Sequence, residues 1–170
     1  MDPEPPTVPD DDFAEWTRVG DSTEVLFDGA PVTVTGRTLR YESTTPGARD
    51  SLDRFFFATR LGLEPSVSPN VALTKLVRSG AADGFRDQLS ERGFKHIQRV
   101  ETRTIPVGDA EADLYRYRAR CAAADGDISA EAMMAVWADD SYQIAGGGYP
   151  LTGDVNTARR ELRRLIRNVR

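Results

Sequence analysis

The fold is decided by residues 128–170, ISAEAMMAVWADDSYQIAGGGYPLTGDVNTARRELRRLIRNVR, because this stretch alone reads as strand, turn, strand, glycine loop and helix. In residues 132–138, AMMAVWA, both alternating sets of side chains are apolar, which predicts a central strand covered on both faces. Asp139, Asp140 and Ser141 are turn residues, and residues 142–145 run back as the partner strand. We therefore expect an antiparallel hairpin.

A helix is expected after this hairpin. Gly146, Gly147 and Gly148 should form the loop that leads to it, and either Thr152 or Asp154 can cap its first turn. The apolar positions of the helix span an arc of about 100° and are Val155, Ala158, Leu162, Leu165, Ile166 and Val169. The adjoining arc is cationic and contains Arg159, Arg160, Arg163, Arg164, Arg167 and Arg170. One side of the helix should therefore pack on the sheet while the other stays strongly basic.

The remainder of the chain predicts further strands, at residues 24–27, 32–41, 55–63, 95–105 and 111–121. Within 32–41 the apolar side chains change from even to odd positions, so we expect a bulge at Gly36 that switches the buried face. Within 111–121 the side chains of Tyr115 and Tyr117 should point inward. The alternate arginines of this strand should then be exposed or covered by acidic groups.

A second long helix is predicted between Ser68 and Gly93. Ser68 followed by Pro69 is a strong helix start, with the serine as cap, and Gly93 is an equally good stop. Gly80 and Gly84 weaken the middle of this helix by about 1 kcal/mol each relative to alanine. They should permit close packing or mark a kink.

Together these elements predict an α+β fold: a mostly antiparallel sheet of about six or seven strands with two long helices on opposite faces. Residues 13–170 are expected to form a single domain, because 170 residues suffice for one well-buried core. Residues 1–12 are rich in proline and acidic side chains, a composition that cannot bury much apolar surface. They are expected to be a disordered acidic arm.

Composition excludes several classes of protein. A single cysteine, Cys121, excludes an internal disulfide, and a single histidine, His96, excludes the usual multi-histidine zinc sites. No cofactor is expected. The N-terminus has no basic and apolar leader, and no stretch approaches about 18 apolar residues. We therefore expect a cytoplasmic protein with no membrane segment.

The charged residues are strongly biased in type. The chain has 20 arginines against 2 lysines and 17 aspartates against 10 glutamates, with a net charge of −5. This bias resembles that of proteins from halophilic archaea, and the sequence is similar to small uncharacterised families of those organisms. A bacterium with a GC-rich genome is the alternative source.

The order of elements, ending in VWADDSYQIAGGGYP and an amphipathic helix, resembles the α/β/α sandwich of the PsbP family and of the Ran-binding nucleotide-release factor. The resemblance covers the layout of residues 16–168. Members of that fold are chiefly binding or assembly proteins, so the resemblance implies a non-catalytic role.

The arginines are the first candidate binding site. The candidate residues are Arg159, Arg160, Arg163, Arg164 and Arg167 on the C-terminal helix and Arg116, Arg118 and Arg120 on the strand 111–121. Arginine suits bidentate recognition of carboxylate or phosphate, so a protein partner or a small anionic ligand is expected. The acidic chain and the absence of a nucleic-acid motif argue against nucleic acid. The competing interpretation is a solvated helix that is salt-bridged to the acidic remainder.

The second hypothesis is a small-molecule carrier or an enzyme with a pocket between the sheet and the helix 68–93. Phe55, Phe57, Tyr115 and Tyr117 would line this pocket.

Three other motifs have a structural interpretation that we favour over a catalytic one. The glycines 146–148 lack the remaining residues of a phosphate-binding loop. Asp139 and Asp140 fit a turn better than a pair of catalytic carboxylates. Cys121 fits the core and His96 an exposed strand start better than a nucleophile and its base.

Overall fold

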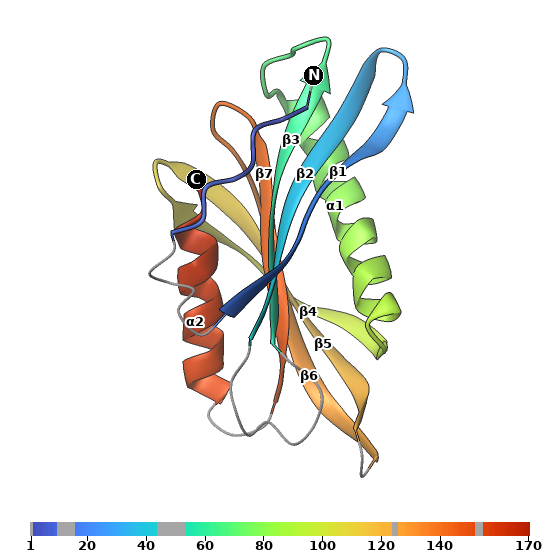
Figure 1. The fold of residues 1–170 in the computed structure, drawn as a ribbon, viewed down its shortest axis with the longest axis vertical. Coiled ribbons are helices and arrows are strands. Elements are labelled where there is room, and N and C mark those ends of the chain that lie inside the picture. The colour runs from blue at the N-terminus through green and yellow to red at the C-terminus, as the bar shows by residue number, and fades with distance from the viewer. Residues whose placement is uncertain (1, 10–15, 44–53, 124–125, 152–154) are drawn as a thin grey trace.

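A computed structural model describes residues 2–9, 16–43, 54–123, 126–151 and 155–170. These residues form one seven-stranded sheet and two helices (Figure 1). The elements in chain order are β1 (Trp16–Gly29), β2 (Val32–Ser43), β3 (Phe55–Glu64), α1 (Val71–Glu91), β4 (Phe94–Val107), β5 (Ala110–Ala123), β6 (Gly126–Ala138), β7 (Tyr142–Pro150) and α2 (Val155–Arg167).

All neighbouring strands are antiparallel, and their order across the sheet is β1-β2-β3-β7-β6-β5-β4. The predicted α+β class, with its succession of strands and helices, is confirmed. Among the described residues one connection leaves the hairpin pattern, because α1 carries the chain from β3, beside the central strand β7, to β4 at the edge of the sheet.

The two helices lie on opposite faces of the sheet, with α1 on one side and α2 on the other (Figure 1). Phe85 and Leu89 of α1 are buried in one apolar cluster with Phe57 and Met134. Leu165 of α2 is buried in a second cluster together with side chains from the opposite sheet face. The sheet is thus the middle of three layers, and each face has its own core.

The hairpin of β6 and β7 is central, as the sequence predicts. Residues 130–137 of β6 are buried on both faces. The expectation of a glycine loop is wrong, because Gly146, Gly147 and Gly148 all lie inside β7, where they pair with β3 and β6. A Cβ atom on Gly146 would lie 2.5 Å from the carbonyl oxygen of Met133, and one on Gly148 would lie 2.8 Å from the Phe55 ring. These glycines therefore serve close packing in the centre of the sheet.

The expected bulge at Gly36 is also absent. The β2–β3 register is continuous, and the irregularities at this edge lie in β1, next to Gly20 and between Val25 and Phe27. Val34 belongs to the core under α1 and Leu39 to the core under α2. The shift from even to odd apolar positions arises because β2 is covered by different layers at its two ends.

Helix α1 begins two residues later than predicted. Asn70, and not Ser68, is the N-cap, and its side-chain oxygen accepts a 2.9 Å hydrogen bond from the Leu73 amide. The predicted stop is confirmed, since the helix ends at Glu91 and Gly93 adopts a φ of 90°. The proposed caps of α2, Thr152 and Asp154, lie outside the described residues.

The N-terminal residues 2–9 form neither helix nor strand, yet they are not the free arm that their composition predicts. Thr7 and Arg170 exchange two backbone hydrogen bonds of 2.5 and 2.9 Å. Pro6 is buried and Val8 packs against the core under α2. Backbone pairing and these two apolar side chains hold the segment against the body despite its acidic residues.

The two helices also bear on whether the chain contains a membrane segment. Neither helix in the described part of the chain combines the length and the apolar character needed to cross a membrane.

Candidate functional site

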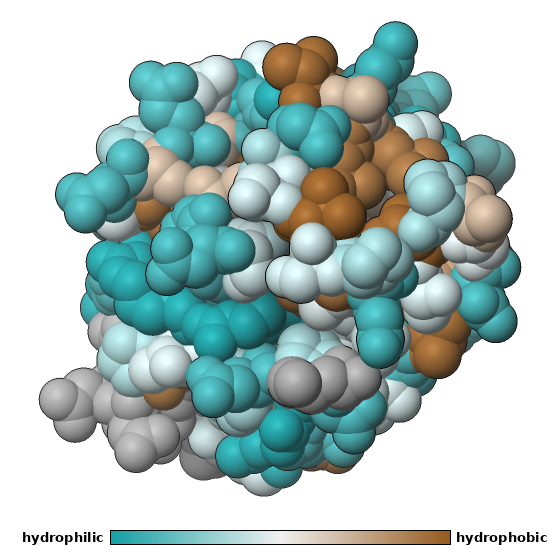
Figure 2. Space-filling model, turned by 90° about the horizontal axis from the view of Figure 1, so that it is seen from above, coloured by the Kyte–Doolittle hydropathy of each residue, from teal (hydrophilic) through white to brown (hydrophobic). Residues whose placement is uncertain are grey.

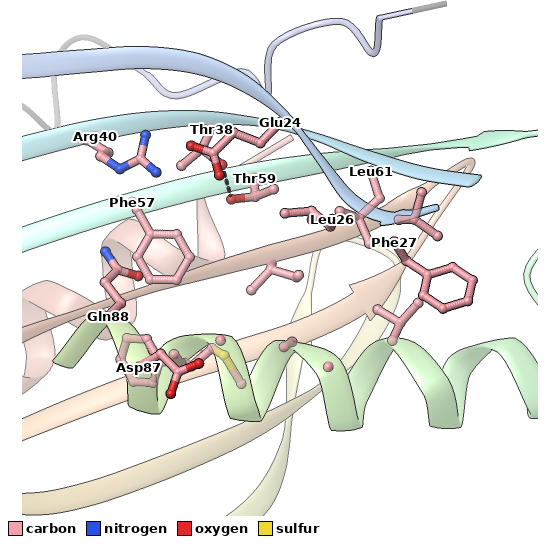
Figure 3. Close-up of a pocket in the computed structure, with 18 of the residues that line it drawn as sticks. Glu24, Leu26, Phe27, Thr38, Arg40, Phe57, Thr59, Leu61, Asp87 and Gln88 are labelled. Atoms are coloured by element: carbon pink, nitrogen blue, oxygen red, sulfur yellow. Dashed lines mark hydrogen bonds between the residues drawn. The ribbon is translucent and has the colours of Figure 1, made fainter. Parts of the chain in front are cut away.

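A groove lies between α1 and the outer strands β1, β2 and β3. Its volume is about 870 Å³, within the range of small-molecule sites in proteins. Helix α1 contacts β4 and β6, and the groove opens where β1–β3 and the helix diverge. Figure 3 shows the groove, with the strands on one side and α1 on the other.

One end of the groove is apolar. Leu26 and Phe27 of β1 are 53% and 44% exposed, and Leu76 of α1, on the opposite wall, is 50% exposed. Leu61 of β3 lies at the same end as Leu26 and Phe27 (Figure 3). Seen from above, apolar surface gathers on the side of the molecule that carries the β1–β2 hairpin and α1 (Figure 2). Apolar side chains facing each other across open space indicate an apolar ligand.

Two glycines leave the helical wall of the groove without side chains. Gly80 and Gly84 of α1 both line it, and a Cβ atom built on either would meet nothing within 4 Å. The close packing that the sequence suggested for these glycines is therefore absent. Their spacing of four residues instead places two positions without side chains on one face of the helix, next to the cavity.

The other end of the groove is polar. Arg40 and Gln88 lie there, opposite the end with Phe27 (Figure 3). Between the two ends the hydroxyl groups of Thr38 and Thr59 are 2.7 Å apart and share a hydrogen bond. The groove thus changes from apolar to polar along its length.

Two guanidinium groups set the electrostatics of the polar end. Burial lowers the pKa of Arg92, the Glu42 carboxylate partly restores it, and the charge of Arg40 lowers it further. The ion pair between Arg92 and Glu42 is long, at 3.6 Å, and Arg40 donates to the Ser22 hydroxyl without an ion pair among the described residues. The groove's carboxylates, on Glu24, Asp87 and Glu91, are exposed, whereas both arginines are half-buried. The less hydrated charges at this end are therefore positive.

The sequence predicts a pocket between the sheet and the helix 68–93, and one of the four residues expected to line it lines this groove. Phe57 lines the groove, but Phe55, Tyr115 and Tyr117 do not. Phe55 packs edge-on against Phe94, and Tyr117 against Phe85, inside the core under α1. These three aromatic side chains fill the region where α1 touches the sheet, and the groove opens where it does not.

A second polar site lies on the other face of the sheet, around Glu131 of β6. Its carboxylate has no exposed surface and accepts hydrogen bonds of 2.8 and 2.9 Å from Arg159 and of 2.5 Å from the Tyr149 hydroxyl. Arg116 adds a contact of 3.3 Å. Burial alone would raise the pKa of Glu131, but these donors outweigh it and hold the pKa below its ordinary value of 4.5. Glu131 is thus a buried anion that organises arginines from two elements.

The arginine ladder of β5 faces α2, and acidic groups cover part of it. Arg116 donates to Glu101 at 2.8 Å, and Arg118 lies 3.8 Å from Glu131. Arg120 donates to the backbone carbonyl of Asp127. Of the two alternatives for this ladder, cover by acidic groups fits Arg116, while Arg118 is 55% exposed.

The structure divides the candidate arginines of α2 into two sets. Arg160, Arg164 and Arg167 are exposed, whereas Arg159 and Arg163 are half-buried and face the sheet. The two predicted arginine groups, on β5 and α2, therefore meet on one side of the sheet. Arg159 is bound to Glu131 as part of the fold.

The other candidates have structural roles. Cys121 is buried, burial raises the pKa of its thiol, and His96 is exposed at a bulge of β4. Asp139 accepts hydrogen bonds from Ser141 and Gln143 within the hairpin turn. In the described ranges no three metal-ligating side chains gather at one place.

Several residues of the two candidate sites escape sequence reasoning. Glu131 lies in an apolar strand with nothing to mark it as a buried anion, and Arg40 and Arg92 are far apart in sequence. The pair Gly80 and Gly84 is a sequence signal that could have pointed at the groove. Two glycines four residues apart in a long helix mark a face without side chains, which suits an open cavity as well as close packing.

Comparison with known proteins identifies a family for this chain. No curated protein and no solved structure is significantly similar to the chain. A family described as a domain of unknown function, DUF6517, matches residues 5–170, which include every strand and helix described above. The chain therefore belongs to the DUF6517 family.

Proposed function

We propose that this protein is a non-enzymatic binding protein that holds a small amphiphilic molecule in the groove between β1–β3 and α1. The observation that carries the proposal is the groove itself, a cavity of about 870 Å³ with exposed apolar side chains on both walls. Burying such side chains against a ligand is favourable by about 25 cal/mol per Å² of apolar surface.

The polarity of the groove supports an elongated ligand with one anionic end. The apolar body of such a ligand would lie between Phe27 and Leu76, beside the part of α1 that has no side chain at Gly80. Its head group would reach Arg40 and Arg92, whose half-buried charges repel each other in the free protein. A carboxylate there gains charge-assisted hydrogen bonds and relieves this repulsion.

The groove supports a binding function better than the outer face of α2 does. Arg159 is committed to Glu131, so the cationic helix offers a partner fewer arginines than the sequence suggests.

The proposal is tested with a fluorescent long-chain carboxylic acid and the alcohol of the same chain, titrated into the purified protein. We expect saturable binding of one acid per chain, with the acid bound more tightly than the alcohol. The double variant Arg40→Gln and Arg92→Gln should weaken the acid at least about tenfold, the effect of losing one or two charge-assisted hydrogen bonds. Binding of the alcohol should change little.

A matched pair of helix variants separates the groove from general surface binding. Gly84→Phe fills the cavity from α1, whereas Ser79→Phe adds the same ring to an exposed position of the helix outside the groove. Binding should be lost in the first variant and kept in the second. The proposal would be overturned if neither the acid nor the alcohol bound saturably. Equal binding of the acid by Gly84→Phe and Ser79→Phe would overturn it too.

A further inference from the structure

The face of the sheet under α2 carries an excess of positive charge. Five arginines, Arg103, Arg116, Arg118, Arg159 and Arg163, surround two carboxylates, Glu101 and Glu131, so the cluster has a net charge of +3. We name this set the arginine cluster. Its members come from β4, β5, β6 and α2, and no continuous sequence motif records it.

The two carboxylates are already engaged by other members of the cluster. Glu131 is held by Arg159, Arg116 and the Tyr149 hydroxyl, as described above. Glu101 accepts a 2.8 Å hydrogen bond from Arg116, and its contact with Arg103 is long, at 3.7 Å. The two carboxylates therefore neutralise mainly Arg116 and Arg159.

Arg163 is less well paired than Arg116 and Arg159, because within the described part of the chain Glu101 acts on it only through its charge. Among the described residues it makes no ion pair, and its Nε atom is buried without a hydrogen-bond acceptor. Burial lowers the pKa of Arg163, the charge of Arg103 lowers it further, and the Glu101 carboxylate offsets part of this shift. Buried hydrogen-bond donors in proteins usually have an acceptor, and the Nε–H of Arg163 does not. An anion bound beside this guanidinium would supply one.

We propose that the arginine cluster is an oxyanion site that binds a phosphate or a phosphomonoester between Arg103 and Arg163. Each guanidinium offers a planar fork of donors, which suits the oxygens of a phosphate. A tetrahedral anion with two charges directs oxygens toward both arginines and offsets most of the net charge of +3. The side chain of Arg103 is 39% exposed, which gives a small anion access from water.

Inorganic phosphate is the first probe, at constant ionic strength, with the side-chain Nε–Hε resonances of the arginines followed by NMR. The resonance of Arg163 should shift saturably, because its Nε–H gains an acceptor. Sulfate should compete and chloride should not. A linear shift that chloride reproduces would mean that Arg163 senses ionic strength alone, and it would overturn the proposal.

Two variants and one control locate the site. Arg163→Gln and Arg103→Gln should each weaken phosphate binding at least tenfold, whereas Arg167→Gln, on the exposed side of α2, should leave it unchanged. Without phosphate, Arg163→Gln should unfold at the same or a higher temperature, because it removes an unpaired charge from a cationic cluster. A Tm about 5 °C or more below that of the native chain would make Arg163 a structural cation and contradict the proposal.

A second probe identifies the source of the anion. Phenyl phosphate carries the same oxygens as a phosphorylated small molecule. Tenfold tighter binding of phenyl phosphate than of inorganic phosphate would assign the site to a phosphomonoester, and equal binding would assign it to free phosphate. An oligonucleotide that binds tightly while phosphate fails to saturate Arg163 would overturn the proposal in favour of a polyanion surface. None of these variants touches the groove, so the two proposals are tested separately.

Discussion

At the scale of single residues, Glu131 links the chemistry of one sheet face to the stability of the fold. A carboxylate without exposed surface is stable only if charged or polar donors replace its lost water, and Arg159, Arg116 and Tyr149 do so. The same donors hold its pKa below 4.5. Because the folded state then binds a proton less readily than the unfolded state, Glu131 stabilises the fold at pH values above 4.5. That contribution is lost as the pH falls from 4.5 through the lowered pKa.

Replacing Glu131 by glutamine should therefore lower the free energy of unfolding by about 3 kcal/mol at pH 7, since it leaves two arginines short of a counter-charge. The difference between the native chain and the variant should shrink as the pH falls below 4.5, because the carboxyl group of the native chain takes up a proton, first in the unfolded state and at lower pH in the folded state. Urea denaturation at a series of pH values measures both effects. Asp83→Asn, at an exposed position of α1, is the control. A constant difference across this pH range would contradict the assignment.

At the scale of elements, β7 and α1 use glycine for opposite purposes. In β7 a Cβ atom on Gly147 would overlap the backbone of Phe55 and lie 3.1 Å from Leu162, so glycine allows β3 and α2 to approach. In α1 the space beside Gly84 is open. The same residue type thus marks dense packing in one element and a cavity wall in the other.

Alanine at these two positions should change stability in opposite directions. Gly147→Ala should lower the free energy of unfolding by about 3 kcal/mol, because the backbone of β3 must move to accept the methyl group. Gly84→Ala should raise it by about 0.5–1 kcal/mol, since it removes conformational freedom from the unfolded chain without a clash. Urea denaturation of both variants decides this. Equal stability of Gly147→Ala and the native chain would show that β7 is less tightly packed than described.

At the scale of the whole molecule, the sequence predicts the fold better than the sites. Alternation and turn residues locate β6 and β7 because one short segment contains both the pattern and its physical cause. The groove depends instead on how far α1 stands from β1–β3, and that separation is set by residues distant in sequence, such as Phe85 and Tyr117. The arginine cluster has the same origin, since strand pairing alone brings Arg118 beside Glu131. Even the glycines of β7 suggest a loop until both neighbouring strands are known.

The pairing of Thr7 with Arg170 brings the first and last described segments together, so the chain can be joined into a ring. Two residues at opposite ends of the family match lie side by side, so a linker of about five glycine and serine residues can join Arg170 to Pro5. A chain joined in this way and reopened between Asp140 and Ser141 should keep the native circular dichroism spectrum and unfold cooperatively. The native, unpermuted chain is the control. Aggregation of the permuted chain under conditions in which the native chain folds would contradict the expectation. If it folds, the order of elements around the ring specifies the structure, and the point at which the ring is cut does not.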